Sequence, residues 1–263
     1  MGLILIILFL TAGYTCLFSL ILLSPWFIIL WVFVSFILAI ITVLLSALCV
    51  LLFCNKKKPK GKIRHFYLRS VCYIAIKLNH IKLTIIGKEN IPQNENYVIY
   101  ANHKSMMDPI CIYYALNQKI TAIGKKSLFK NKIMKLIAKT FDAIPLDRDN
   151  DREAAKSIIE GIKKIKNGLP ILIFPEGGIK SRDSEEMSDL KAGAYKLAVK
   201  SNASILPVSI LGTSIIKESS LFKKKKVKVI IHKPITKEEY NGKNTHEIGH
   251  EVEEIINNGV KNG

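Results

Sequence analysis

Residues Tyr97–Pro109 read YVIYANHKSMMDP and carry two secondary-structure signals in one short segment. The β-branched and aromatic residues at its start are typical of a strand, whereas the residues after Pro109 have a helical pattern. In one continuous helix, five residues turn about 500°, which would leave the side chains of His103 and Asp108 about 140° apart. The two side chains can therefore meet only across a strand-to-helix turn, with His103 in the loop and Asp108 on the first helical turn, where Pro109 is tolerated.

The chain beyond residue 55 repeats this alternation of short strands and longer helices. Such a pattern predicts an α/β fold with a mixed, largely parallel central sheet flanked by helices. Ligand sites in these sheets lie beyond the carboxyl ends of the strands. The predicted strands are Leu83–Ile86, Tyr97–Ala101, Ile120–Ile123, Ala143–Leu146, Leu169–Phe174, Ile205–Leu211 and Val227–His232. The predicted helices are Ile110–Leu116, Leu128–Thr140, Arg152–Lys166, Leu190–Ser201 and Thr245–Asn257.

The 263-residue chain separates its apolar residues from its charged ones. It has 39 basic and 21 acidic residues and a formal net charge of +18, yet no Lys, Arg, Asp or Glu precedes Lys56. As one helix, Gly2–Phe53 would run about 78 Å, against about 30 Å for the hydrocarbon core of a bilayer. We therefore expect two apolar helices, Leu3–Leu23 and Phe27–Phe53, with a break at Ser24-Pro25.

This composition predicts a membrane-anchoring helical hairpin over residues 1–54 and an α/β domain over residues 55–263. The segment Asn55–Arg64, directly after the apolar run, holds six basic residues and no acidic one. By the positive-inside rule this flank is cytoplasmic, so we expect the α/β domain on the cytoplasmic face of a membrane. A re-entrant helix pair would give the same side. A secretory signal peptide is disfavoured, because no Lys or Arg precedes the apolar run.

The excess of positive charge favours an anionic membrane surface as a partner. Only five of the 39 basic residues are arginines and no basic motif is interleaved with aromatic residues, so nucleic-acid binding is disfavoured.

The five cysteines form no C-x-x-C pair, which argues against a disulfide framework or a zinc ribbon. His246 and His250 have a spacing that permits a metal pair, but no third ligand is evident. The sequence implies no metal and no cofactor.

A second motif, Phe174–Gly178 with the sequence FPEGG, directly follows the apolar segment Leu169–Ile173. Together with Tyr97–Pro109 it resembles the glycerolipid acyltransferase family, whose best-known type is 1-acylglycerol-3-phosphate acyltransferase. Two further segments are similar to blocks of that family, Ile144–Arg148 (IPLDR) and Ile205–Ile210 (ILPVSI). The resemblance covers roughly residues 97–211, and the apolar N-terminal hairpin matches how many members attach to membranes.

The resemblance implies a role for each matching residue. His103 would be the general base, oriented by Asp108, and Pro207 belongs to the block that helps to shape the acyl-donor site. Within the acceptor site, the arginine at position 148 would contact phosphate and the glutamate at position 176 would help to bind the glycerol portion. The expected substrate-binding residues are Asn102, Lys125, Arg148, Glu176, Gly177, Gly178, Lys180 and Arg182.

The chain departs from the family at one point. The family motif usually continues F-P-E-G-T-R-S, whereas Gly178 and Ile179 occupy the usual Thr and Arg positions. Recognition of the acceptor phosphate could pass to Lys180 or Arg182, or the head group of the acceptor could be a different one.

The reaction expected from this resemblance moves an acyl chain from acyl-CoA or acyl-carrier protein to the sn-2 hydroxyl of 1-acylglycerol 3-phosphate, giving phosphatidic acid. His103 would take the hydroxyl proton, so no acyl-enzyme is required.

Ser105 is too close in sequence to His103 and Asp108 for triad geometry, and Cys111 is typical of a core cysteine. The alternatives are the same chemistry on another lysophospholipid or on glycerol 3-phosphate, and a non-catalytic lipid-binding scaffold, which the intact His103 and Asp108 disfavour.

Overall fold

The computed structural model describes residues 2–22, 28–53, 61–147, 149–188, 190–220 and 223–263. The chain divides into two compact units, Met1–Ile74 and Ala75–Gly263. The division predicted from composition, at residues 54 and 55, stays a prediction.

Three helices form the first unit: α1 (Gly2–Leu22), α2 (Ile28–Phe53) and the greater part of α3 (Lys62–Leu78). The segments Gly2–Leu20 and Ile29–Ser46 are long and apolar enough to cross a membrane, with mean hydropathies of 2.3 and 2.8. Their large side chains are mostly exposed, for example Phe9 at 79% and Ile29 at 86%. Because these helices are not the buried core of the unit, they fit membrane association.

Several hydroxyl side chains of α1 and α2 form hydrogen bonds within the unit. Thr11 and Thr42 donate their hydroxyls to backbone carbonyls one helical turn earlier, at 2.8 Å each. Tyr14 and Thr42 join the two helices through a hydroxyl contact of 3.2 Å. Such bonds satisfy hydroxyl groups inside an apolar environment, where water cannot.

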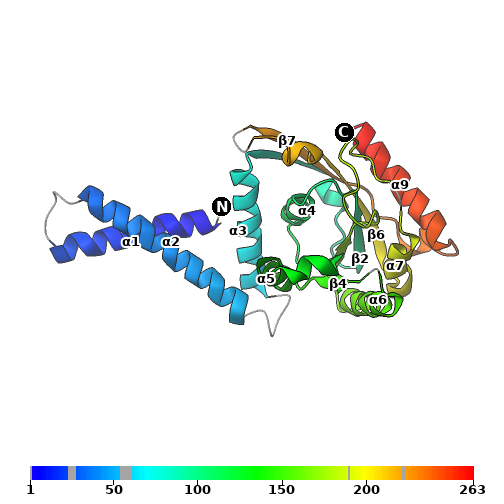
Figure 1. Ribbon diagram of the computed structural model, residues 1–263, viewed down its shortest axis with the longest axis horizontal. Coiled ribbons are helices and arrows are strands. Elements are labelled where there is room, and N and C mark those ends of the chain that lie inside the picture. Colours follow the sequence, from blue (N-terminus) through cyan, green and yellow to red (C-terminus); the bar gives the residue numbers. More distant parts are fainter. Residues whose placement is uncertain (1, 23–27, 54–60, 148, 189, 221–222) are drawn as a thin grey trace. The chain divides into compact units, whose positions relative to one another are not determined.

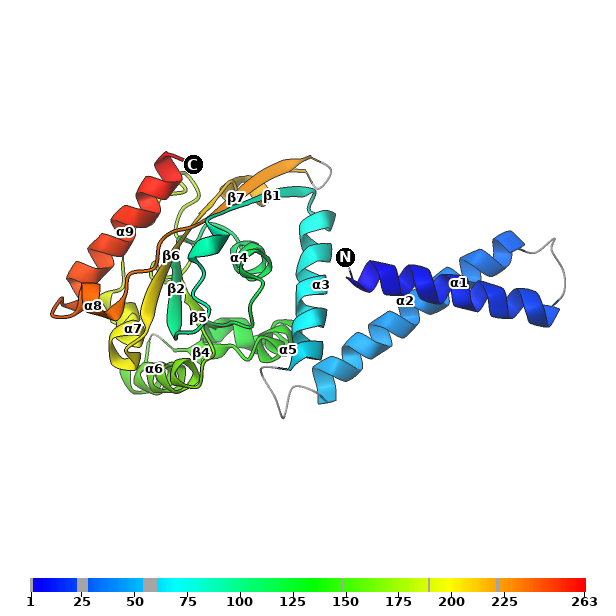
Figure 2. The same ribbon diagram turned by 180° about the vertical axis from the view of Figure 1, so that it is seen from behind.

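The second unit is built on a seven-stranded sheet with the order β1-β7-β6-β2-β5-β3-β4 (Figures 1 and 2). Strands β2 to β6 are mutually parallel through their pairings, and β7 runs antiparallel to β6 while pairing in parallel with β1. The predicted mixed, largely parallel sheet is confirmed. The strands are β1 (Ile81–Ile86), β2 (Tyr97–Ala101), β3 (Thr121–Lys125), β4 (Ile144–Leu146), β5 (Ile171–Ile173), β6 (Ser204–Leu211) and β7 (Lys225–Ile231).

Helices cover both faces of this sheet. Helix α4 lies on the side of the sheet opposite α7 and α9 (Figures 1 and 2). All five residues of β2 are buried, since the strand lies in the middle of a sheet that is covered on both faces. The remaining helices of this unit are α4 (Asp108–Leu116), α5 (Lys132–Thr140), α6 (Asp151–Lys166), α7 (Lys196–Ser201), α8 (Lys237–Tyr240) and α9 (Thr245–Lys261).

The main core of this unit lies between the sheet and helices α6, α7 and α9. Val98 and Tyr100 of β2 contribute to it, together with Ile165 of α6 and Val252 of α9. The ring of Tyr100 stacks on that of Tyr195, with centroids 4.5 Å apart. This packing fixes the position of β2, the strand that runs directly into His103.

Two predicted helices are divided in the structure. The predicted helix Leu190–Ser201 is a 3-10 helix, Ala192–Tyr195, followed by α7. The predicted helix Leu128–Thr140 is a 3-10 helix, Lys126–Lys130, followed by α5, because the backbone at Asn131 is extended and separates the two. Helix α3 was not predicted, although its sequence KIRHFYLRSVCYIAIKL has apolar residues at helical spacing. Its first residues, Lys62–Arg64, are the end of the charged flank Asn55–Arg64, and no helix was expected there.

Candidate active site

The carboxyl ends of the parallel strands meet at one edge of the sheet and gather the candidate residues there. Tyr100 of β2 pairs with Ile173 of β5 and with Pro207 of β6. The turns that carry His103 and Glu176 therefore leave the sheet side by side. Strands β3 and β4 end at the same edge, since β3 pairs in parallel with both β5 and β4.

His103 and Asp108 are in contact across the strand-to-helix turn. Asp108 is the first residue of α4, with Pro109 in the first turn, and its carboxylate Oδ2 lies 2.9 Å from the ring Nδ1 of His103. The spacing of five residues requires this arrangement for the two side chains to meet.

The Asp108 carboxylate is fully buried and holds the turn together. Its Oδ2 atom also accepts hydrogen bonds from the backbone N–H groups of Lys104 and Ser105, both at 2.7 Å. These donors stabilise the negative charge. A charged carboxylate at Nδ1 favours the tautomer of His103 that carries its proton on Nδ1, which leaves Nε2 with a lone pair.

The imidazole of His103 is also held through its face. The ring of Phe174 stacks on it, with centroids 4.0 Å apart and an interplanar angle of 17°. The His103 side chain keeps 14% of its surface exposed. The ring is therefore fixed in place and still reachable from solvent.

Glu176 reaches the same turn from the end of β5. Its Oε1 atom accepts a hydrogen bond of 2.7 Å from the backbone N–H of His103, and its Oε2 atom forms an ion pair of 2.8 Å with Nζ of Lys104. Both side chains of this ion pair are buried. Lys104 was not predicted as a site residue. The available signal was that this lysine lies in the motif at the end of the buried strand β2.

Asn102 ties the turn to its neighbours from within the protein. It is fully buried; its Nδ2 donates to the carbonyls of Glu185 and Ile210, and its Oδ1 accepts from the N–H of Ile210. The amide thus joins the end of β2 to the end of β6. A direct contact between Asn102 and substrate stays a prediction.

Of the basic residues expected around the acceptor, Lys125 lies at the end of β3. It is exposed and lies opposite Leu146 of β4 in the register. The next residue, Lys126, forms an exposed ion pair of 2.9 Å with Asp147. Arg148 lies outside the described residues.

The segment after β5 begins with a tight turn. The N–H of Gly177 bonds to the carbonyl of Phe174, and Gly177 has a φ of 80°, a conformation that favours glycine. Gly178 has a φ of 152°. Lys180 is exposed, and the Nε atom of Arg182 is buried without a hydrogen-bond partner among the described residues.

Glu185 anchors the far end of this segment, and the sequence analysis missed it. Its Oε1 atom accepts bonds from the N–H groups of Gly212 and Ser214 and from the Ser214 hydroxyl. Pro207 lies buried inside β6 and is opposite Tyr100 of β2. Its role in the acyl-donor site stays a prediction.

Two other nucleophiles weighed from the sequence have structural roles. Ser105 is buried, and its hydroxyl accepts a bond of 3.3 Å from the N–H of Met107. Cys111 is fully buried on α4, as a core cysteine is.

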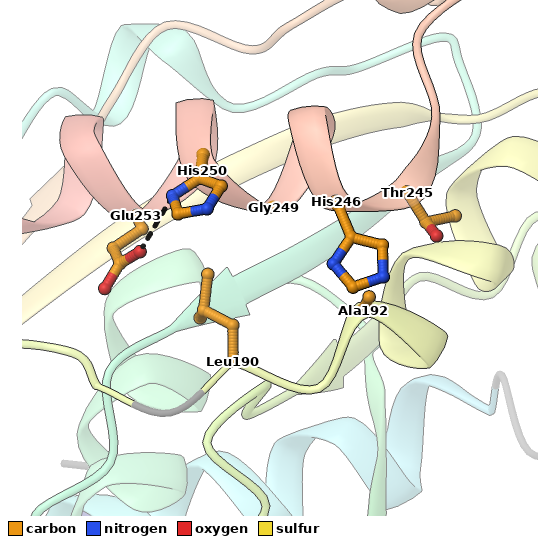
Figure 3. Close-up of a pocket in the computed structure, with 7 residues that line it drawn as sticks. All are labelled: Leu190, Ala192, Thr245, His246, Gly249, His250 and Glu253. Atoms are coloured by element: carbon orange, nitrogen blue, oxygen red, sulfur yellow. Dashed lines mark ion pairs between the residues drawn. The ribbon is translucent and has the colours of Figure 1, made fainter.

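A surface pocket beside α9 contains the two histidines that are four residues apart (Figure 3). His250 forms an ion pair of 3.6 Å with Glu253, while His246 points toward Ala192 (Figure 3). In the part of the chain that the structure describes, no three His, Cys, Asp or Glu residues are grouped so that they could hold a metal ion.

The family model and two relatives that match this chain are all named acyltransferases. The family model called Acyltransferase matches residues 82–211. A 1-acyl-sn-glycerol-3-phosphate acyltransferase of Bacillus subtilis is 37% identical over 152 residues, which cover 57% of this chain and 72% of the relative. The enzyme of the same name from Borreliella burgdorferi is 32% identical over 147 residues, covering 56% of this chain and 58% of the relative.

A solved structure is similar over most of the chain. The crystal structure of the 1-acyl-sn-glycerophosphate acyltransferase of Thermotoga maritima aligns with a TM-score of 0.65 and 27% identity, covering 81% of this chain and 86% of that one.

The mixed sheet and the match of residues 82–211 to the Acyltransferase model define the class as acyltransferase. The chain belongs to the Acyltransferase family, and the two relatives, of which it covers 58% and 72%, are named 1-acyl-sn-glycerol-3-phosphate acyltransferases.

Proposed function

We propose that the protein transfers an acyl chain from a thioester to the sn-2 hydroxyl of 1-acylglycerol 3-phosphate and so produces phosphatidic acid. The contact of 2.9 Å between His103 and the buried Asp108 is the observation that carries this proposal. Similarity to enzymes named for this activity supports it.

His103 is the general base of the proposed reaction. Asp108 holds the Nδ1 proton, so Nε2 can accept the proton of the acceptor hydroxyl as its oxygen attacks the thioester carbonyl. When the tetrahedral intermediate collapses, the C–S bond breaks, the new ester remains, and the thiolate takes the proton from His103. The acceptor oxygen bonds directly to the acyl carbon, so no acyl-enzyme forms.

The acceptor phosphate would bind among the basic residues at the same edge of the sheet. Lys125 lies at the end of β3, and Lys180 and Arg182 follow the Gly177 turn, near the position where the family usually has an arginine. Arginine suits this role through its forked geometry, and Arg148 is proposed for it as well. Gly178 adds no side chain at the turn, and Pro207 contributes to the acyl-donor region.

The location of the enzyme follows from its two apolar helices. We propose that α1 and α2 hold it at a membrane, with the α/β unit on the cytoplasmic face against anionic lipid, where a lysophospholipid acceptor resides. Release of the full-length chain from vesicles by a high-salt wash alone would contradict this anchoring, because salt screens charges and leaves apolar insertion intact.

Gly178 and Ile179, in place of the usual Thr and Arg, make the acceptor the part of the proposal to test first. Detergent-purified wild type should be assayed on 1-acylglycerol 3-phosphate, other lysophospholipids and glycerol 3-phosphate, each with acyl-CoA and with acyl-carrier protein as donor. We expect the highest kcat/KM on 1-acylglycerol 3-phosphate. Faster turnover on another acceptor would keep the chemistry and change the substrate, and transfer to none of them would favour the scaffold function.

A further inference from the structure

We propose that Lys104 is a positioning residue for the His103 base and that it acts through Glu176; this inference rests on the proposed function. Lys104 follows His103 directly in the chain, yet its ammonium points away from solvent, with 4% of the side chain exposed. The exposed lysines of this basic chain do not share that environment.

The contacts form a clamp around two consecutive residues. One carboxylate, that of Glu176, bonds the His103 N–H through Oε1 and the Lys104 ammonium through Oε2, at 2.7 and 2.8 Å. The Lys104 N–H and the His103 ring are bonded in turn by Asp108. The His103 turn is thus held between two carboxylates that come from different segments of the chain.

The charge of Lys104 makes this clamp possible. A carboxylate with 1% of its side chain exposed is costly to bury without a counter-ion, so Glu176 needs the ammonium in order to stay beside the His103 N–H. Buried ion pairs contribute little net stability compared with well-packed apolar residues. The geometry therefore points to placement of the catalytic turn as the function of the pair.

The turn that supplies Glu176 also supplies Phe174. The Gly177 N–H bonds to the Phe174 carbonyl at 3.1 Å, and the Lys191 N–H bonds to the Pro175 carbonyl at 3.0 Å. When Lys104 holds Glu176, it holds the same turn that stacks Phe174 on the imidazole. This role for Glu176 differs from the glycerol contact that the family resemblance implies.

The first test compares single variants of the full-length protein. Lys104→Met should lower kcat by about 10- to 100-fold and change the acceptor KM much less, because a small displacement of the base affects the chemical step. Lys104→Arg restores the positive charge and should recover most of the rate. The matched control is Lys156→Met, which removes an exposed ion pair on α6. Wild-type kcat in Lys104→Met would overturn the proposal.

Two neutral double variants test the contact through which Lys104 would act, even if Lys104→Met alone does not fold. Lys104→Met/Glu176→Gln and Lys104→Met/Glu176→Leu both lack the charges, but only the first keeps a side-chain oxygen that can accept the His103 N–H. We expect kcat of the Leu double variant to be at least about tenfold lower than that of the Gln double variant at similar melting temperatures. Equal kcat values in the two would overturn the proposal.

A readout without turnover separates this proposal from the proposed function. Labelling of His103 by diethyl pyrocarbonate, followed by mass spectrometry, reports how the imidazole is held. Faster labelling in the Leu double variant than in the Gln double variant supports positioning, and equal labelling contradicts it. If wild type transfers no acyl chain to any acceptor, the proposed function fails, and this comparison still decides whether the Glu176 oxygen, through which Lys104 would act, positions His103.

Discussion

His103 is held at three separate points. Asp108 bonds its ring, Glu176 bonds its main-chain N–H, and Phe174 stacks on its face. A base that must meet a hydroxyl and a thioester together gains from such support, because reaction rates depend steeply on the alignment of the reacting atoms. The proposed base is thus held in place by the protein alone.

Replacement of Asp108 tests the orientation of that base. In Asp108→Asn the side chain loses its negative charge while its oxygen stays toward the Lys104 and Ser105 N–H groups, so the bond to the Nδ1 proton of His103 weakens and the imidazolium formed on proton transfer is less stabilised. We expect kcat to fall by about 10²- to 10⁴-fold with little change in KM. The control is Glu153→Gln, an exposed carboxylate on α6. A loss in kcat below about threefold would show that Asp108 does not orient the base.

Some of these residues could be predicted from sequence and others could not. His103 and Asp108 are five residues apart, so turn geometry alone limited how they could meet. Lys104 and Glu176 are 72 residues apart, and their contact depends on the pairing of β2 with β5. Spacing in the sequence carries no information on such a pairing, so the ion pair emerged only from the fold.

The short turn Phe174–Gly177 is the element that connects β5 to the catalytic turn. Its conformation depends on Gly177, whose φ of 80° places a side chain too close to its own backbone. The turn delivers Phe174 and Glu176 to His103 together. A change in its backbone should therefore affect stability and catalysis at once.

Gly177→Ala tests this coupling. We expect it to lower the free energy of unfolding by about 1–2 kcal/mol, and to lower kcat, because a Cβ disfavours the left-handed conformation. Denaturant unfolding in detergent and steady-state kinetics measure the two effects. Gly193→Ala is the control, since a Cβ there meets no atom within 4 Å and its φ is not positive. Unchanged stability and kcat in Gly177→Ala would show that the turn does not need glycine.

Strands were more predictable than helices in this chain. All seven predicted strands are present, because short β-branched runs between polar turns are distinctive. Helix α3 was missed because its basic residues looked like a flank of the membrane segment. The break at Asn131 was missed because nothing in the residues around it ends a helix by itself.

At the scale of the whole molecule, the chain separates an apolar N-terminal segment from the part that holds the candidate active site. The first 53 residues hold no Lys, Arg, Asp or Glu, and the candidate active-site residues all lie in the second unit. This separation could be read from composition alone.

The most direct measurement is the rate of phosphatidic acid formation by the full-length protein, wild type beside His103→Ala, on 1-acylglycerol 3-phosphate with an acyl thioester. The proposed general-base mechanism predicts transfer by wild type and a loss of about 10²-fold or more in kcat in the variant, which should keep its melting temperature. Transfer by His103→Ala at the wild-type rate would contradict the assignment of His103 as the base.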